Sequence, residues 1–174
     1  MPLSLHAAFV PSALQMLGTT HGLLDKAEAW CGEQNAEPGA LIGACLHDEM
    51  LPFAYQVKSV ATHTGVAIEG IRAGAFTPHM EPPPEDFAGL RAKLDEAVAT
   101  LEGVSEDELE AKIGAPMLFQ MREFKMPFAA QDFLLSFSQP NFYFHAATAY
   151  DILRMKGLSV GKRDFLGRMR LQQS

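Results

Sequence analysis

Cysteine and positive charge are both scarce in this chain of 174 residues, and each shortage excludes something. Cys31 and Cys45 form no spaced metal set and nothing marks the chain as secreted, so we expect reduced thiols that act as small apolar fillers. Lysine and arginine number 14 against 21 acidic residues, which gives a net charge of −7. Because that charge repels phosphate backbones and anionic membranes, we expect neither a nucleic-acid nor a membrane partner.

Long apolar runs and the common catalytic motifs are also missing. No segment approaches the roughly 18 uninterrupted apolar residues of a membrane helix, and the N-terminus lacks the basic start of a signal peptide. We therefore expect a cytoplasmic protein. The sequence contains no G-x-G-x-x-G, G-x-x-x-x-G-K-S/T or H-E-x-x-H pattern. Nucleotide-binding loops and zinc-protease helices are therefore not indicated.

Apolar residues instead recur at spacings of three and four, the period of a helix that buries one face. The pattern predicts a first helix from about Ser12 to Cys31, which Ser12 and Gln15 can open as a capping box. A second helix is expected to begin with Pro52 as its first helical residue and to end near Ala73. The core positions that we expect on these and the later stripes include Leu17, Leu24, Val57, Val60, Leu94 and Ile152.

The later helices are marked by their ends. Asp86, or the glutamate before it, opens a third helix that runs to about residue 101, and Ser105 can cap a short helix. Pro140 fits the first turn of the last helix, where its missing N–H costs nothing. That helix is expected to stop at a Schellman motif, with Gly157 in the left-handed C′ position.

Two segments lack the helical period. Residues 76–85 contain four prolines and are expected to form an extended crossover in which His79 is exposed. Residues 115–129 alternate only partly, so a short hairpin and an irregular crossover both stay open. Four substantial helices with such connections predict a single all-α domain over residues 1–174, a four-helix bundle with long crossover connections.

Several polar side chains fall on or beside the inward stripes. Gln56 and His63 belong to the second helix, and Asn141, His145 and Tyr150 belong to the last. An unsatisfied polar atom in a core costs about 1–3 kcal/mol, so these groups must bond one another, water or a ligand. We expect a small-molecule pocket with His145 and His63 as catalytic residues and Gln56, Asn141 and Tyr150 as binding residues. A structural network that sets helix register remains the alternative.

The strings HDEMLPFAYQVKSVATH and NFYFHAATAYDILRMKGLSVGKRDFLG resemble an uncharacterised bacterial domain-of-unknown-function family. That family looks like a branch of the DinB/YfiT-like superfamily of proposed metalloenzymes. The resemblance covers nearly the whole chain and implies a four-helix bundle, often a homodimer, that holds a divalent metal such as Zn or Ni through three histidines. His63 and His145 match two of these ligands, whereas Asn141 stands where the third should be.

An asparagine carbonyl is a weak ligand for zinc or nickel, so three hypotheses follow. The favoured one is a protein that binds or modifies an unidentified small molecule at His63, Asn141 and His145 without a catalytic metal. A second, implied by the resemblance, is a divalent-metal-dependent transferase or isomerase that uses a thiol cofactor. The third is a non-catalytic homodimeric interaction protein, and whether the protein is an enzyme stays open.

Overall fold

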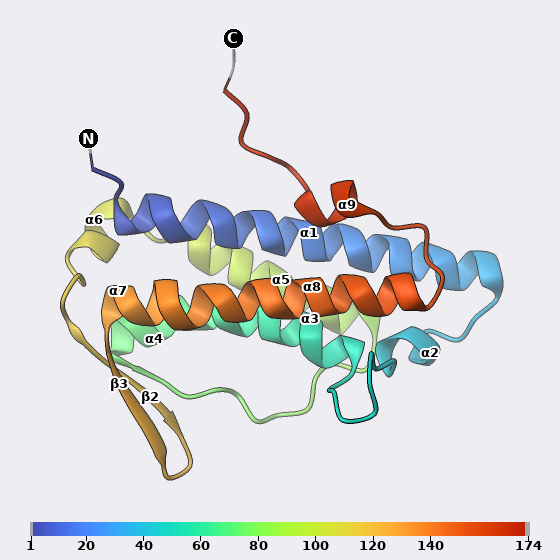
Figure 1. Ribbon diagram of the computed structural model, residues 1–174, viewed down its shortest axis with the longest axis horizontal. Coiled ribbons are helices and arrows are strands. Elements are labelled where there is room, and N and C mark those ends of the chain that lie inside the picture. Colours follow the sequence, from blue (N-terminus) through green and yellow to red (C-terminus); the bar gives the residue numbers. More distant parts are fainter. Residues whose placement is uncertain (1, 173–174) are drawn as a thin grey trace.

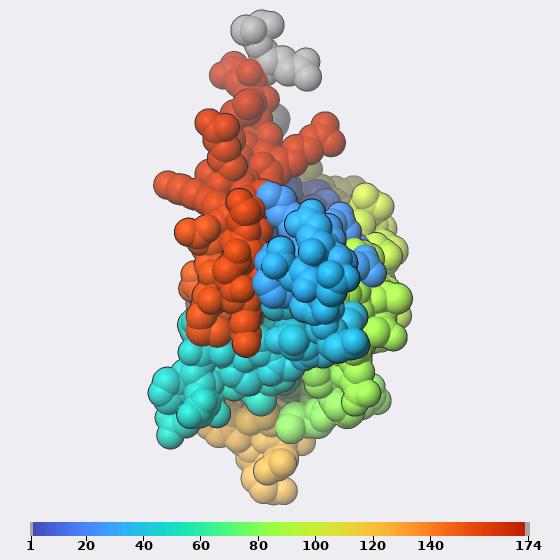
Figure 2. All heavy atoms as spheres, turned by 90° about the vertical axis from the view of Figure 1, so that its right-hand side faces the viewer, coloured from blue at the N-terminus to red at the C-terminus, as the bar shows by residue number. Residues whose placement is uncertain are grey.

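The computed structural model describes residues 2–172, and most of them are helical (Figure 1). The long helices run beside one another: α1 packs against α5 and α8, and α3 also packs against both. An end-on view shows the ends of α8 and α1 side by side (Figure 2). The bounds are α1 Leu5–Gln34, α3 Phe53–Ala61, η1 Thr62–Val66, α4 Ala67–Ala73, α5 Phe87–Glu102 and α8 Gln139–Met155.

The expectation of an all-α protein is wrong in one respect, because the chain also forms a small sheet in the order β1-β2-β3. Its strands are β1 (Ala75–Phe76), β2 (Pro116–Met121) and β3 (Phe124–Ala129). β2 and β3 are antiparallel, so the hairpin is the correct alternative for residues 115–129, and β1 adds to β2 in parallel. The pairing of β1 with β2 joins segments about 40 residues apart, which no local pattern reveals.

Several helix ends form where the sequence placed them. The Asp86 carboxylate accepts a hydrogen bond from the Gly89 N–H at 2.6 Å, and the Ser105 hydroxyl accepts one from the Glu108 N–H at 3.2 Å. At the end of α8, Gly157 has a φ of 91°, and the Leu158 N–H bonds the Leu153 carbonyl at 3.1 Å. That bond closes the predicted Schellman motif. Shorter helices are α2 Gly39–Ile42, α6 Glu106–Glu110 and α9 Lys162–Leu166.

The predicted start of the first helix at Ser12 is wrong. α1 begins at Leu5, and Ser4 is its N-cap, with its hydroxyl accepting from the Ala7 N–H at 3.1 Å. Pro11 therefore lies inside the helix, a position that usually costs about 3 kcal/mol. The added turns bury Leu5, Phe9 and Val10 in the core, which offsets that cost.

The last helix, α8, begins at Gln139 with Pro140 in its first turn, as predicted, but no break separates it from the helical turns before it. α7 (Ala130–Asp132), the π-helical segment η2 (Phe133–Ser138) and α8 follow one another with right-handed helical backbone angles at each junction. Pro140 therefore lies both in the first turn of α8 and within a continuous helical stretch, just after the π turns. A helix tolerates π turns, and here they come directly before Pro140, which has no N–H to donate.

The six residues expected in the core are all fully buried. Their burial confirms the helical stripes as the main source of the hydrophobic core. Cys31 is buried and Cys45 partly exposed, and both are free thiols. None of the helices in the described part of the chain has the length and hydropathy needed to span a bilayer.

Candidate functional site

The first histidine of the candidate site comes from a π turn. His63 lies in η1 and is only 9% exposed. Its ring packs against Phe76, with the centroids 5.8 Å apart, and against Phe137 at 5.6 Å. These rings come from β1 and η2, so a strand and two π-helical segments, η1 and η2, meet at this histidine. Such π turns are frequent at functional sites.

The second histidine is held in one tautomer by a glutamine. The Gln56 side chain is buried, and its Nε2 donates to the Leu51 carbonyl at 2.7 Å. That bond directs Oε1, which can only accept, to His145 Nδ1 at 2.7 Å. His145 must therefore carry its proton on Nδ1, which leaves Nε2 with a free lone pair.

The structure brings the two histidines together, as expected. The ring centroids of His63 and His145 lie 5.7 Å apart, and the ring planes differ by 10°. Burial, and then the nearby His145, lowers the pKa of His63 to about 3, and burial lowers the pKa of His145 to about 4. Both rings are therefore neutral at pH 7. His63 Nδ1 is buried and has no hydrogen-bond partner among residues 2–172.

Of the other three expected site residues, one contacts the histidine pair and two make their contacts elsewhere. Gln56 belongs to the cluster through its bond to His145. Asn141 lies one turn before His145, but its amide nitrogen donates to the Phe137 carbonyl at 2.7 Å and so is committed to its own helix. Tyr150 packs instead against Phe165, at 5.9 Å between centroids. Five residues along a helix turn the side chain away from the face of His145, which explains the separation.

The donor set does not match the metal site that the family resemblance implies. Nowhere in residues 2–172 do three His, Cys, Asp or Glu side chains gather so that they could hold a metal ion. His63 and His145 supply two imidazoles, and Asn141 stands in the third place with its amide nitrogen bonded to the main chain. Because open catalytic zinc sites use three protein ligands, the pair is one ligand short.

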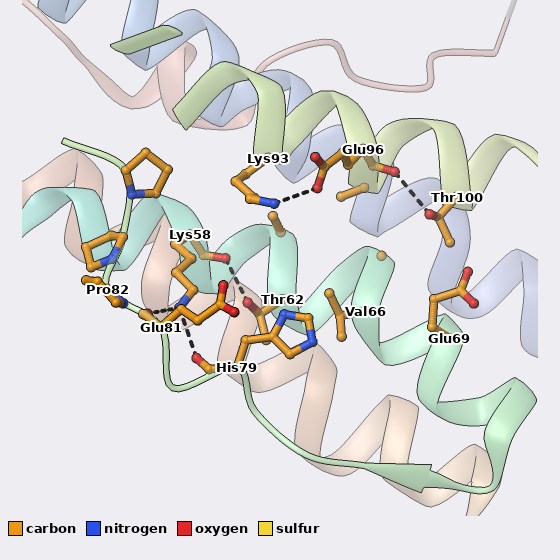
Figure 3. A pocket seen from close by; sticks show the side chains of 15 residues that line it. Lys58, Thr62, Val66, Glu69, His79, Glu81, Pro82, Lys93, Glu96 and Thr100 are labelled. Atoms are coloured by element: carbon orange, nitrogen blue, oxygen red, sulfur yellow. Dashed lines mark hydrogen bonds and ion pairs between the residues drawn. The ribbon is translucent and has the colours of Figure 1, made fainter. Parts of the chain in front are cut away.

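The structure also contains a cavity that the sequence did not reveal (Figure 3). It measures about 370 Å³ and lies between α3 and η1, α5, and the proline-rich crossover after β1. Lys58 lines it, only 7% exposed, and its Nζ donates to the carbonyl oxygens of His79, at 2.9 Å, and Glu81. His79 itself is exposed, as expected. In the sequence, the only sign of this cavity was a lysine next to Val57 of the buried stripe, because no local pattern places the crossover over Lys58.

Comparison with known proteins now identifies the family. Residues 5–166 match the family described as "Domain of unknown function (DUF1993)". The chain belongs to the DUF1993 family. The fold of this DUF1993 chain is similar to the crystal structure of a DinB family member protein from Shewanella denitrificans, with a TM-score of 0.83 and 26% sequence identity over 98% of this chain and 96% of that one. No curated protein matches the sequence. The expected resemblance to DinB-like proteins is thus confirmed.

Proposed function

We propose that this DUF1993 protein binds a small uncharged molecule at His63 and His145, within a four-helix bundle of DinB-like type and without a catalytic metal. The observation that carries the proposal is the buried His63 Nδ1, which has no hydrogen-bond partner in the described part of the chain. A buried polar atom left unsatisfied costs about 1–3 kcal/mol, and a ligand that bonds it would recover that free energy. We include Asn141, one turn before His145, only through its side-chain oxygen, because its amide nitrogen is bonded to the Phe137 carbonyl.

The chemistry of the pair favours an uncharged ligand. Because the pKa values of both histidines are lowered by burial, neither ring offers a positive charge for an anion at pH 7. Gln56 holds His145 with Nε2 free to accept a hydrogen bond from a ligand hydroxyl or amide. The same Nε2 can act as a general base only weakly, since a base of low pKa holds a proton poorly at neutral pH.

The surroundings of the pair favour a ligand with an apolar or aromatic body. Phe76 and Phe137 pack on His63, and Tyr55 and Phe144 lie edge-on to His145 at 6.0 and 5.3 Å. Phe144 is 55% exposed, so solvent reaches this side of the cluster. A few polar atoms among aromatic walls is the usual composition of a small-molecule site.

The proposal can be tested with benzyl alcohol and benzamide, each an aromatic ring with one hydrogen-bonding group. In ¹⁵N spectra of histidine-labelled protein, either probe at millimolar concentration should shift the resonances of His63 and His145 and not those of exposed His79. His63→Phe should abolish the shift of His145, whereas the matched variant His79→Phe should leave it unchanged.

Two outcomes would contradict the proposal. Binding that survives in His63→Phe would place the ligand elsewhere. If His145→Ala unfolds the protein and neither probe shifts any histidine of the wild type, the cluster is instead a structural network that sets helix register.

A further inference from the structure

Lys58 is buried in a way that lysine side chains rarely are. It is 7% exposed, and lysines are almost never buried so deeply unless an acidic partner neutralises them. Its Nζ donates instead to two main-chain carbonyl groups of the crossover, those of His79 and Glu81, and it forms no ion pair with any residue between 2 and 172. The amine thus donates to uncharged carbonyl groups at the wall of a cavity (Figure 3).

This arrangement makes the neutral form of the amine easier to reach than in an exposed lysine. Burial lowers the pKa of Lys58, the charge of Glu81 opposes that shift, and the charge of Lys93 adds to it to a smaller extent. A neutral amine has two N–H groups, and the carbonyls of His79 and Glu81 accept two hydrogen bonds. When the amine is neutral and donates these two hydrogen bonds, its lone pair occupies the remaining position on Nζ and is available to react. Desolvation beside a second cation is how proteins make a lysine nucleophilic.

We infer that Lys58 is a nucleophilic amine that forms a Schiff base with a small carbonyl compound in the cavity beneath the crossover. The Nζ lone pair bonds to the carbonyl carbon, and the π electrons of the C=O bond move to its oxygen. One proton passes from Nζ to that oxygen and gives a carbinolamine. The hydroxyl then leaves with the second Nζ proton as water, and a C=N bond forms without any oxidant or reductant.

The lining of the cavity indicates which carbonyl compounds fit. Ala61, Val66 and Ala97 form apolar walls together with the prolines of the crossover. Glu69, Glu81 and Glu96 also line the cavity and outnumber the lysines there, Lys58 and Lys93, so the lining as a whole disfavours an anion. The cavity volume of about 370 Å³ lies within the range of small-molecule sites. The substrate class is therefore an uncharged aldehyde or ketone rather than a keto acid.

Reductive trapping tests this inference on the intact protein. The wild-type chain is incubated with butanal and cyanoborohydride at pH 7, and the modification of each lysine is followed over time by peptide mass spectrometry. Lys58 should be modified several-fold faster than the exposed Lys125 and Lys156. The same reaction in guanidinium chloride should remove the difference, because unfolding abolishes the burial. Pyruvate in place of butanal should modify Lys58 more slowly.

Three results would overturn the inference. If Lys58 is modified no faster than Lys125 and Lys156 in the same digest, its amine is not activated. A rate advantage that persists in guanidinium chloride is not a property of the fold. Pyruvate reacting as fast as butanal would refute the assigned substrate class. Lys58→Met should eliminate the fast phase, while Lys125→Met should leave it intact.

Discussion

The buried histidine pair predicts a steep loss of stability between pH 7 and pH 5. In the unfolded chain both histidines titrate near the ordinary pKa of 6.5, whereas in the folded protein the pKa of His63 is about 3 and that of His145 about 4. Below pH 6.5 the unfolded state therefore binds more protons than the folded state. The free energy of unfolding must then fall as the pH falls, until the folded histidines themselves titrate.

The magnitude follows from the two pKa values. Each unit of difference is worth about 1.4 kcal/mol, so at pH 5 each histidine lowers the free energy of unfolding by about 2 kcal/mol relative to pH 7 or above. Together the pair would remove about 4 kcal/mol, a large part of the 5–15 kcal/mol that is typical of a folded domain. Glu108 and Asp164, whose pKa values lie below their ordinary 4.5 and 3.8, lose their contribution only at lower pH.

Urea unfolding followed by circular dichroism at pH 7 and pH 5 measures this loss. His63→Phe and His145→Phe should each keep only about half of it, because one histidine remains. The exposed His79→Phe should behave like the wild type. A wild-type loss below about 1 kcal/mol, or single variants that lose as much as the wild type, would refute the assignment of both histidines as neutral buried groups.

Four further predictions follow from the packing and the site. Ile152→Ala removes a fully buried side chain and should lower the free energy of unfolding by about 2–5 kcal/mol, whereas Lys93→Ala, on the surface, should cost little in the same urea titration. Gly65→Ala would place a Cβ 2.6 Å from the Cα of Ala97 and should destabilise the protein by about 1–3 kcal/mol; an unchanged melting temperature would contradict that close contact. Protein purified without a histidine tag should contain less than about a tenth of an equivalent of transition metal by mass spectrometry and should bind none on titration, since a third ligand is missing; stoichiometric zinc or nickel would restore the metalloenzyme hypothesis. Sedimentation should show a homodimer at micromolar concentration, formed through α1 and α8, and a monomer throughout that range would count against it.

Local features of this protein could be predicted because their causes lie within a few residues. The caps at Asp86 and Ser105 satisfy N–H groups three residues away, and the Schellman motif at Gly157 closes over one turn. The buried stripe that contains Val57 and Val60 follows from helical periodicity alone. The same periodicity put His63 and His145 on inward faces, although it could not say how their rings would meet.

Where two local solutions compete, the sequence could not decide between them. Ser4 and Ser12 can each cap the first helix, and the choice of Ser4 depends on the burial of Leu5 and Phe9 against the rest of the core. The hairpin at residues 115–129 likewise depends on β1, which supplies the hydrogen bonds of the neighbouring strand.

The candidate sites depend even more on long-range packing. The bond from His145 to Gln56 joins positions 89 residues apart and fixes the tautomer of the ring, and the π turn at His63 lets it lie among aromatic rings from distant segments. Lys58 became a buried amine only because the crossover folds back over α3 and offers its carbonyl groups. Sequence alone determined which faces of the helices turn inward. Tertiary structure decided which polar groups meet there, because the partners and the burial that set their protonation come from other parts of the chain.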